Sequence, residues 1–192
     1  MEHIVLENEV VYLRPIEIED IAAITEVAKD ERIWVHMSDY LMTDEAVEMY
    51  VRKAVAEREA GLAYKFVIIK KCSGKIVGST SFLDIAKAHK RLEIGATWLS
   101  PEVWRTAMNT NCKYLLLAYC FEVLQYNRVQ IKTGHENLRS QNAIERIEAK
   151  KEGVLRNHMI QRDGSIRHTV MYSVTLEDWP KVKALFQGEL LK

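Results

Sequence analysis

The sequence is poor in the residues that interrupt a chain or cross-link it. Its 192 residues include 8 glycines, 3 prolines and 3 cysteines, and no Gly-, Pro- or Ser-rich tract divides them. Cys72, Cys112 and Cys120 form no CxxC pair and cannot all pair within the chain, which favours a reducing compartment. No run of about 18 apolar residues is present, and no basic segment precedes an apolar one at the N-terminus. We therefore expect a cytoplasmic protein without a signal peptide or spanning helix.

The sequence also lacks a net charge and the short motifs of several enzyme classes. Lys plus Arg equals Asp plus Glu, at 27 each, so no overall field would draw the molecule to nucleic acid or an anionic membrane. GxGxxG, P-loop and GxSxG motifs are missing, and neither the six histidines nor the cysteines have zinc-ligand spacing. We expect no nucleic-acid partner, no membrane partner and no metal site.

The length and composition are those of one globular domain, which we expect to span residues 1–192. Apolar residues make up 48% and charged residues 28%, which argues against disorder. Residues 1–63 hold fifteen acidic and six basic residues, whereas residues 125–170 hold five acidic and nine basic ones. Solvated helix faces would explain this asymmetry. Alternatively, the first segment faces a cationic ligand and the second an anionic one.

Hydrophobic periodicity predicts elements in the order β, α, α, β, β, β, α, β, α, β, β, α. The strands are expected at residues 10–16, 64–71, 75–85, 91–99, 128–133, 153–161 and 165–176. The helices are expected at 18–28, between Thr43 and Gly61, at 109–124, at 140–149, and after Asp178 as N-cap. Two antiparallel hairpins are expected at the turn residues 72–74, which end in Gly74, and at Asp163-Gly164. The unit from Arg91 to Thr133 should be a parallel, right-handed crossover. A mixed sheet with helices on both faces follows.

The turn between the strand at 91–99 and the apolar helix at 109–124 is a first candidate site. A helix start offers unpaired backbone N–H groups to a phosphate. Further donors or charge would come from Ser100, Arg105, Thr106, Asn109 and Thr110. An ordinary strand–helix turn would explain the same residues.

Glu93 is a second candidate. Regular alternation would place Arg91, Glu93, Gly95, Thr97 and Leu99 on one face of their strand, and Leu92, Ile94, Ala96 and Trp98 on the other. A carboxylate beside a glycine on an inner strand favours a cleft, where a bulge or a ligand approaches the backbone. The alternative is a structural ion pair with a neighbouring Lys or Arg.

The polar stretch from Asn137 to Ala143 is a third candidate. It lies between a predicted strand and a predicted helix, and it includes Ser140 and Asn142. Side chains of this kind commonly cap a helix start, because they bond to its free N–H groups. A ligand contact is the alternative interpretation.

These elements and residues together resemble the GNAT superfamily of acetyl-CoA-dependent N-acetyltransferases, and within it the ribosomal-protein alanine N-acetyltransferase subgroup. The matching segments are Leu13-Arg14-Pro15, residues 92–99, Asn109 with residues 113–117, Arg128-Val129, residues 137–146, residues 151–156, Asp163-Gly164, residues 171–173 and residues 177–180. The match runs from about residue 10 to residue 190 with the family's spacing. The ordered set carries the resemblance, since no single segment is decisive.

The resemblance implies an α/β (α+β) fold with a mixed, mostly antiparallel sheet of six to seven strands and helices on both faces. A central parallel strand pair would splay apart, and acetyl-CoA would lie in the gap. The residues assigned to the cofactor by resemblance are Trp98, Leu99, Arg105, Thr106, Ala107, Met108, Asn109, Thr110, Asn137 and Asn142. The resemblance also places Glu93 as the base, Ser140 near the thioester sulfur, and the acceptor beside the first two helices.

The chemistry of the reaction fits these residue types. Amine attack on a thioester needs a neutral amine, so a carboxylate must accept a proton directly or through water. The developing oxyanion needs fixed donors, which the backbone of a bulged strand supplies. We therefore expect direct transfer of acetyl from acetyl-CoA to a primary amine, without an acyl-enzyme. A protein N-terminus, a polyamine and another small amine are all possible acceptors, and a homodimer is expected by analogy.

The sequence departs from the family pattern in the cofactor turn. The turn usually reads Gln or Arg, two residues, Gly, one residue, then Gly or Ala; Glu102, Arg105 and Ala107 stand at these positions. Asn111 stands where the subgroup often has Glu, and Glu148 replaces a glycine after the predicted helix at 140–149. These departures leave an alternative function open, that of a catalytically degenerate acyl-CoA-binding or scaffold protein.

Overall fold

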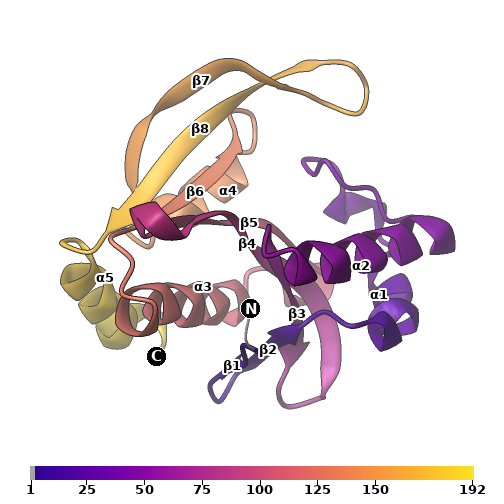
Figure 1. Ribbon diagram of the computed structural model, residues 1–192, viewed down its shortest axis with the longest axis horizontal. Helices are drawn as coiled ribbons and strands as arrows, with labels where there is room; N and C mark the ends of the chain where they lie inside the picture. Colours follow the sequence, from indigo (N-terminus) through magenta and orange to yellow (C-terminus); the bar gives the residue numbers. More distant parts are fainter. Residues whose placement is uncertain (1–2) are drawn as a thin grey trace.

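The computed structural model describes residues 3–192, which contain eight strands and five α-helices (Figure 1). The strands are β1 (Leu6–Glu7), β2 (Val11–Pro15), β3 (Tyr64–Lys70), β4 (Lys75–Ala86), β5 (Arg91–Leu99), β6 (Arg128–Gly134), β7 (Lys150–Ile160) and β8 (Ile166–Thr175). The helices are α1 (Ile21–Ala28), α2 (Asp44–Glu59), α3 (Met108–Ala118), α4 (Leu138–Glu145) and α5 (Trp179–Leu185). The predicted order of elements is confirmed, with one strand added before it.

All eight strands form one sheet in the order β1-β2-β3-β4-β5-β6-β8-β7. Neighbouring strands are antiparallel except β5 and β6, which are parallel. The mixed, mostly antiparallel sheet and its one parallel crossover are therefore confirmed. The expected number of six to seven strands is wrong because β1, which pairs Leu6 with Leu13, is too short to show a period.

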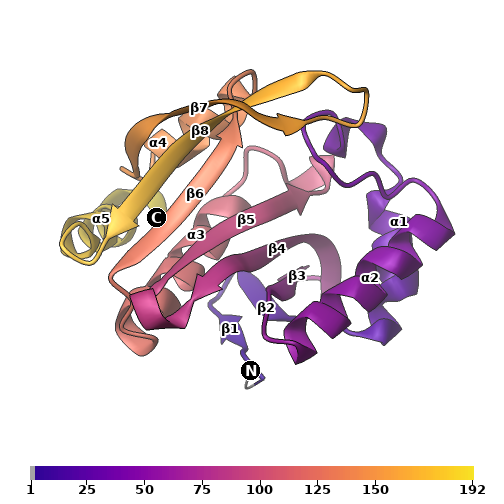
Figure 2. The ribbon, with the colours of Figure 1, turned by 45° about the horizontal axis from the view of Figure 1, so that its top comes forward.

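The parallel pair separates after three residues. Arg91, Leu92 and Glu93 of β5 pair with residues 128–130 of β6, and no later residue of β5 pairs with β6. Beyond this point the two strands diverge toward their C-terminal ends (Figure 2). The expected splayed pair is confirmed, and Glu93 is the last paired residue before the strands separate.

Helices cover both faces of the sheet, as predicted. On one face, Leu116 of α3 and Trp179 of α5 share a core with Leu92 and Ile94 of β5. On the other face, α1 and α2 form a second core that includes Trp98 of β5. The apolar period of each helix thus matches the sheet face that it covers.

The helix boundaries follow from local capping and backbone geometry. The Thr43 hydroxyl accepts a hydrogen bond from the Ala46 N–H at 3.2 Å, so the predicted cap of α2 is confirmed, and Gly61 follows the helix at φ 70°. The apolar helix predicted over 109–124 is α3, which continues as a π-helical turn over Tyr119–Val123. The helix predicted at 140–149 begins two residues earlier, and it ends at Glu145, before Glu148 with its left-handed backbone (φ 57°).

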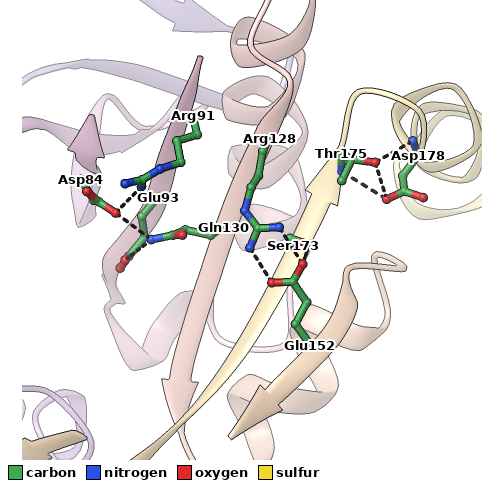
Figure 3. Close-up of polar contacts among 9 residues, drawn as sticks. All are labelled: Asp84, Arg91, Glu93, Arg128, Gln130, Glu152, Ser173, Thr175 and Asp178. Atoms are coloured by element: carbon green, nitrogen blue, oxygen red, sulfur yellow. Dashed lines mark hydrogen bonds and ion pairs between the residues drawn. The ribbon is translucent and has the colours of Figure 1, made fainter. Parts of the chain in front are cut away.

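Asp178 stands at the N-cap position of α5 but does not cap the helix through its side chain. Its carboxylate instead accepts hydrogen bonds from the backbone N–H and hydroxyl of Thr175 (Figure 3). It also accepts one from Lys150. The predicted N-cap position is therefore confirmed, but the side chain holds the end of β8 and does not bond to the free N–H groups of α5.

The β7–β8 hairpin arches from the sheet toward the segment between α1 and α2 (Figures 1 and 2). At its tip the Arg162 guanidinium lies 3.9 Å from the centre of the Tyr40 ring. The hairpin therefore reaches over the sheet face that α1 and α2 only partly cover. No helix among residues 3–192 is long and apolar enough to cross a membrane.

Candidate active site

A bulge in β5 lies just beyond the point where β5 and β6 separate. Ala96 has a left-handed backbone (φ 47°), and the pairing with β4 shifts between Ser81↔Gly95 and Ser79↔Trp98. As a result Trp98 points into the core beneath α1 and α2, whereas Leu99 joins the core beneath α3. The predicted alternation thus ends at Gly95 and is wrong after it, because the bulge adds one residue to β5.

Glu93 is buried (2% exposed), and one of its carboxylate oxygens has two polar partners. Its Oε2 lies 2.9 Å from Nζ of Lys132 and accepts a hydrogen bond from the Gln130 side chain at 3.3 Å. The ion pair that the sequence left as the alternative therefore exists. It supplies the counterion that a buried carboxylate requires.

The other oxygen of Glu93 lies against the bare backbone of Gly95. A Cβ at Gly95 would be 2.5 Å from Glu93 Oε1, so only glycine leaves room for the carboxylate here. In the paired strand β4, Ser81 is opposite Gly95, and its buried hydroxyl has no hydrogen-bond partner in residues 3–192. Oε1 is thus the oxygen of Glu93 that is available to a substrate or a water molecule.

A second carboxylate, Asp84, is linked to Glu93 through one amide. The Gln130 side chain donates to Asp84 at 3.1 Å as well as to Glu93, and Arg91 pairs with Asp84 at 2.5 Å (Figure 3). Two strands away, Arg128 pairs with Glu152, and this pairing lowers the pKa of Glu152 to about 2. The open face of the sheet near Glu93 is therefore lined with paired charges.

Lys113 is a buried lysine of α3 that the sequence analysis did not identify. Its ammonium group donates to the Thr97 hydroxyl at 3.1 Å, immediately after the bulge, and Thr97 in turn contacts the Thr80 hydroxyl at 2.8 Å. Burial lowers the pKa of Lys113 to about 8. A lysine within an apolar run gives no sequence signal of its own, since its burial depends on how α3 packs on the sheet.

In the turn after β5, the N-cap residue provides no side-chain cap to the start of α3. Arg105 has a left-handed backbone (φ 60°), and Ala107 is the N-cap residue of α3. The Thr106 hydroxyl donates to the Val103 carbonyl at 2.7 Å and accepts a hydrogen bond from the N–H of the buried Met108 at 3.3 Å, so the later N–H groups of this turn remain uncapped. Uncapped N–H groups at a helix start are suited to bind an anion.

Two polar side chains of the first turn of α3 differ in their surroundings. Asn109 has a buried side-chain oxygen with no partner in the described part of the chain. Thr110 is buried and accepts a hydrogen bond from Arg146, the C-cap residue of α4. The Thr110 hydroxyl therefore joins two helices, and Arg146 adds a positive charge beside the start of α3.

At the start of α4, Asn137 acts as a helix cap. Its side-chain oxygen accepts a hydrogen bond from the Ser140 N–H at 3.1 Å, while Ser140 is half-buried and Asn142 is exposed. Arg139 stacks on Trp104 with its guanidinium carbon 4.2 Å from the ring centre. The structure therefore brings the turn after β5 and the start of α4 together, as cofactor binding in the gap would require.

An open cleft of about 1250 Å³ lies elsewhere, between α1, the β3–β4 turn and the first residues after β5. Its lining includes Arg14, Lys75 and Glu102 but none of Glu93, Asn137 or Ser140. Among the predicted site residues, Ser100 of the turn after β5 lines this cleft, whereas the residues assigned to the cofactor and to catalysis do not. Within residues 3–192, no group of three or more His, Cys, Asp or Glu side chains is placed to hold a metal ion.

Comparison with known proteins identifies the family. The family model described as Acetyltransferase (GNAT) domain matches residues 11–150. The uncharacterized N-acetyltransferase YoaA of Bacillus subtilis is 25% identical over 172 residues, which cover 88% of this chain and 96% of YoaA. The chain belongs to the GNAT acetyltransferase family and is an acyltransferase. The putative ribosomal N-acetyltransferase YdaF of Bacillus subtilis is 30% identical over 121 residues, which cover 63% of this chain and 61% of YdaF.

Solved structures agree with this assignment. A GCN5-related N-acetyltransferase from Brucella melitensis has a TM-score of 0.91 at 27% identity, over 99% of this chain and 86% of that one. Mycobacterium smegmatis RimJ, solved in complex with CoA-disulfide, has the same fold, with a TM-score of 0.81 at 22% identity over 97% and 93% of the two chains. The fold expected from the resemblance is confirmed.

Proposed function

We propose that the protein transfers the acetyl group of acetyl-CoA to a primary amine by direct attack. The observation that carries this proposal is the separation of β5 and β6 directly after Glu93, with the uncapped start of α3 at the far end of β5. The gap offers two rows of unpaired strand backbone to an extended pantetheine arm. The GNAT family, to which the chain belongs, uses acetyl-CoA.

The residues of the turn and of α4 fit the cofactor in distinct ways. N–H groups at Ala107 and Asn109 would bind the diphosphate, with positive charge from Arg105 and Arg146. The Met108 N–H, which donates to the Thr106 hydroxyl at 3.3 Å, would join them by exchanging that bond for a phosphate oxygen. The backbone of Trp98 and Leu99 would pair with the pantetheine amides. The amide nitrogen of Asn137 would contact the same arm, because its side-chain oxygen is used to cap α4.

Bound acetyl-CoA supplies an activated acyl carbon with a thiolate as leaving group. In the proposed reaction the acceptor nitrogen forms a bond to that carbon, the carbon–sulfur bond breaks, and the amine loses one proton. Glu93 accepts this proton through Oε1, since Lys132 and Gln130 occupy Oε2. The Ser140 hydroxyl donates a hydrogen bond to the departing sulfur. The proton held by Glu93 passes through water to the thiolate, so that the products are an amide and a thiol and both side chains return to their starting state.

Calorimetry with acetyl-CoA and thiol release with a panel of amines test the proposal. We expect micromolar binding together with turnover of at least one primary amine. Binding without any turnover would instead support a degenerate acyl-CoA-binding protein, the function suggested by Glu102 and Arg105. Absence of binding would contradict both functions.

The substitution Glu93→Gln tests the role of the carboxylate. It should lower turnover at neutral pH by about 10²–10⁴-fold, the range for loss of a general base, while the affinity for acetyl-CoA stays close to that of the wild type. Asp84→Asn is the matched control, because it alters the carboxylate at the other end of Gln130. An unchanged rate in Glu93→Gln, or a larger loss in Asp84→Asn, would show that Glu93 is not the base.

A further inference from the structure

Among the basic side chains on the open sheet face near Glu93, Arg167 lacks the carboxylate partner that the other three have. Three are ion-paired with carboxylates at 2.5–2.9 Å: Arg91 with Asp84, Arg128 with Glu152, and Lys132 with Glu93. Arg167 of β8 lies on the same face, because it alternates with Val170, Tyr172 and Val174 of the core on the other face. Arg167 makes no ion pair or hydrogen bond with any other described residue, and its buried Nε atom has no partner.

The side chain of Arg167 lies across the end of β6, not out in solvent. A Cβ at Gly134 would be 3.2 Å from its Nε and 3.6 Å from its Cδ. The lack of a side chain at Gly134 thus lets the arginine lie flat against the strand, next to Lys132 on the same face. Burial lowers the pKa of Arg167, and the one charge that acts against this effect is Glu93. The guanidinium is therefore within the electrostatic reach of the candidate base.

Glu93 does not neutralise Arg167, because its Oε2 is already paired with Lys132 at 2.9 Å. On this face, two cations, Lys132 and Arg167, therefore lie near the single carboxylate of Glu93. A partly buried cation without a counterion is costly. A ligand that brings its own anion would remove this cost when it binds.

We propose that Arg167 binds a carboxylate of the acceptor, so that the preferred acceptor is an amine that carries a carboxylate close to its amino group. The inference rests on the proposed function and adds the chemical class of the acceptor. The planar guanidinium presents paired N–H donors that match the two oxygens of a carboxylate. With the carboxylate held at Arg167, the amino group of the acceptor lies toward Glu93, where its proton is accepted.

Two sources could supply this carboxylate: the α-carboxylate of a free amino acid, or an acidic side chain near the N-terminus of a peptide. Both would be tested with matched pairs. One series compares amino acids with their amides. The other compares amidated peptides that carry Asp or Glu at the second or third position with the same peptides carrying Asn or Gln. The series in which the carboxylate raises kcat/KM identifies the source of the carboxylate.

In the wild type, the carboxylate member of one series should have at least a tenfold higher kcat/KM, with most of the difference in KM. Arg167→Gln should abolish this preference, and Arg167→Lys should retain part of it, because lysine keeps the charge but not the paired donors. Arg156→Gln, at an exposed position of β7, is the control and should leave the preference unchanged. Equal values for both members in the two series, or a preference that survives in Arg167→Gln, would overturn the proposal.

Binding measurements keep this result separate from the proposed function. Calorimetry with the carboxylate ligands, in the presence of CoA, should show binding to the wild type that is weakened at least tenfold in Arg167→Gln. If this difference is present but no thiol is released, the proposed reaction fails and the carboxylate site stands. If amines are acetylated but no carboxylate ligand depends on Arg167, the site fails and the reaction stands. Thermal unfolding of the three variants checks that they are folded.

Discussion

At the residue scale, two of the four positions that depart from the family pattern are also positions of backbone strain. Glu148 and Arg105 stand where the family pattern has glycine, and both have left-handed backbones, with φ of 57° and 60°. A non-glycine residue in this region costs about 1 kcal/mol, because Cβ crowds the following carbonyl. The fold therefore keeps the backbone path that glycine would favour, although the side chains there are different.

Glu148→Gly should raise the free energy of unfolding by about 0.5–1 kcal/mol, because glycine adopts this conformation without crowding. The substitution also removes the ion pair with Lys181, at 2.7 Å between exposed side chains. This loss should lower the free energy of unfolding by only a few tenths of a kcal/mol. Urea denaturation would measure the change. Glu148→Ala is the control, since it removes the ion pair and keeps the strained Cβ, and it should give no increase. A less stable glycine variant would contradict the strain assigned to this position.

At the scale of elements, α4 shows how one residue can serve both a helix and a ligand. The sequence allowed Asn137 to be either a cap or a cofactor contact, and the structure shows the cap. The amide oxygen of Asn137 makes the cap, and its amide nitrogen remains able to donate a hydrogen bond to a ligand. A sequence pattern cannot separate the two roles, because both call for the same residue at the same place.

Asn137→Ala should lower the free energy of unfolding by about 1 kcal/mol through loss of the cap, and it should also weaken acetyl-CoA binding. Asn137→Asp separates the two effects, since its carboxylate keeps the cap but cannot donate a hydrogen bond. We expect the stability of the Asp variant to stay near that of the wild type while its affinity for acetyl-CoA falls. The measurements are urea denaturation and calorimetry. Full affinity in Asn137→Asp would exclude a cofactor contact by the amide nitrogen.

The elements themselves were predictable because their signals are local. Thr43, Gly61, Gly74 and the Asp163-Gly164 pair marked ends and turns that the structure confirms. The bulge at Ala96 was not predictable in position, although Gly95 favoured one nearby. A bulge depends on how β5 pairs with β4 and diverges from β6, and those contacts are not encoded in the period of β5 alone.

At the scale of the whole molecule, the sheet separates two cores and carries the candidate site between them. Trp98 and Leu99 are adjacent in sequence but belong to opposite cores, so the strand that lines the gap is anchored on both faces. The cation–π contact of Arg162 with Tyr40 ties the β7–β8 hairpin to the α1–α2 segment. The open face with Glu93 and Arg167 therefore lies between parts of the chain that are distant in sequence.

The buried lysine beneath this sheet should make stability depend on pH. Burial lowers the pKa of Lys113 from 10.5 to about 8, so between these values the unfolded chain binds more protons at this group than the folded one. This group therefore makes the free energy of unfolding rise with pH in that window. Below pH 8 both states are protonated, and the cost of burying the ammonium group is fully present.

Lys113→Met should raise the free energy of unfolding at pH 7 by about 1–2 kcal/mol, since it removes that cost and loses one hydrogen bond to Thr97. The gain should shrink toward pH 9.5, where the wild-type lysine is neutral when folded. Urea denaturation of both proteins at the two pH values measures this difference. Burial raises the pKa of the neighbouring Cys112 to about 12, but both proteins keep this thiol, so its effect largely cancels. A gain that is the same at both pH values would contradict the assignment.

The sequence by itself determined the order of elements, most turns and caps, the resemblance to the GNAT family, and Glu93 as the candidate carboxylate, because each depends on residues close together in the chain. Tertiary structure decided the pairing of Glu93 with Lys132, the burial of Lys113, and the absence of a partner for Arg167 within the described residues. Glu93 and Arg167 are brought into one electrostatic environment by β6 and β8. A charge that is paired in one strand register is unpaired in another, and only the assembled sheet sets the register.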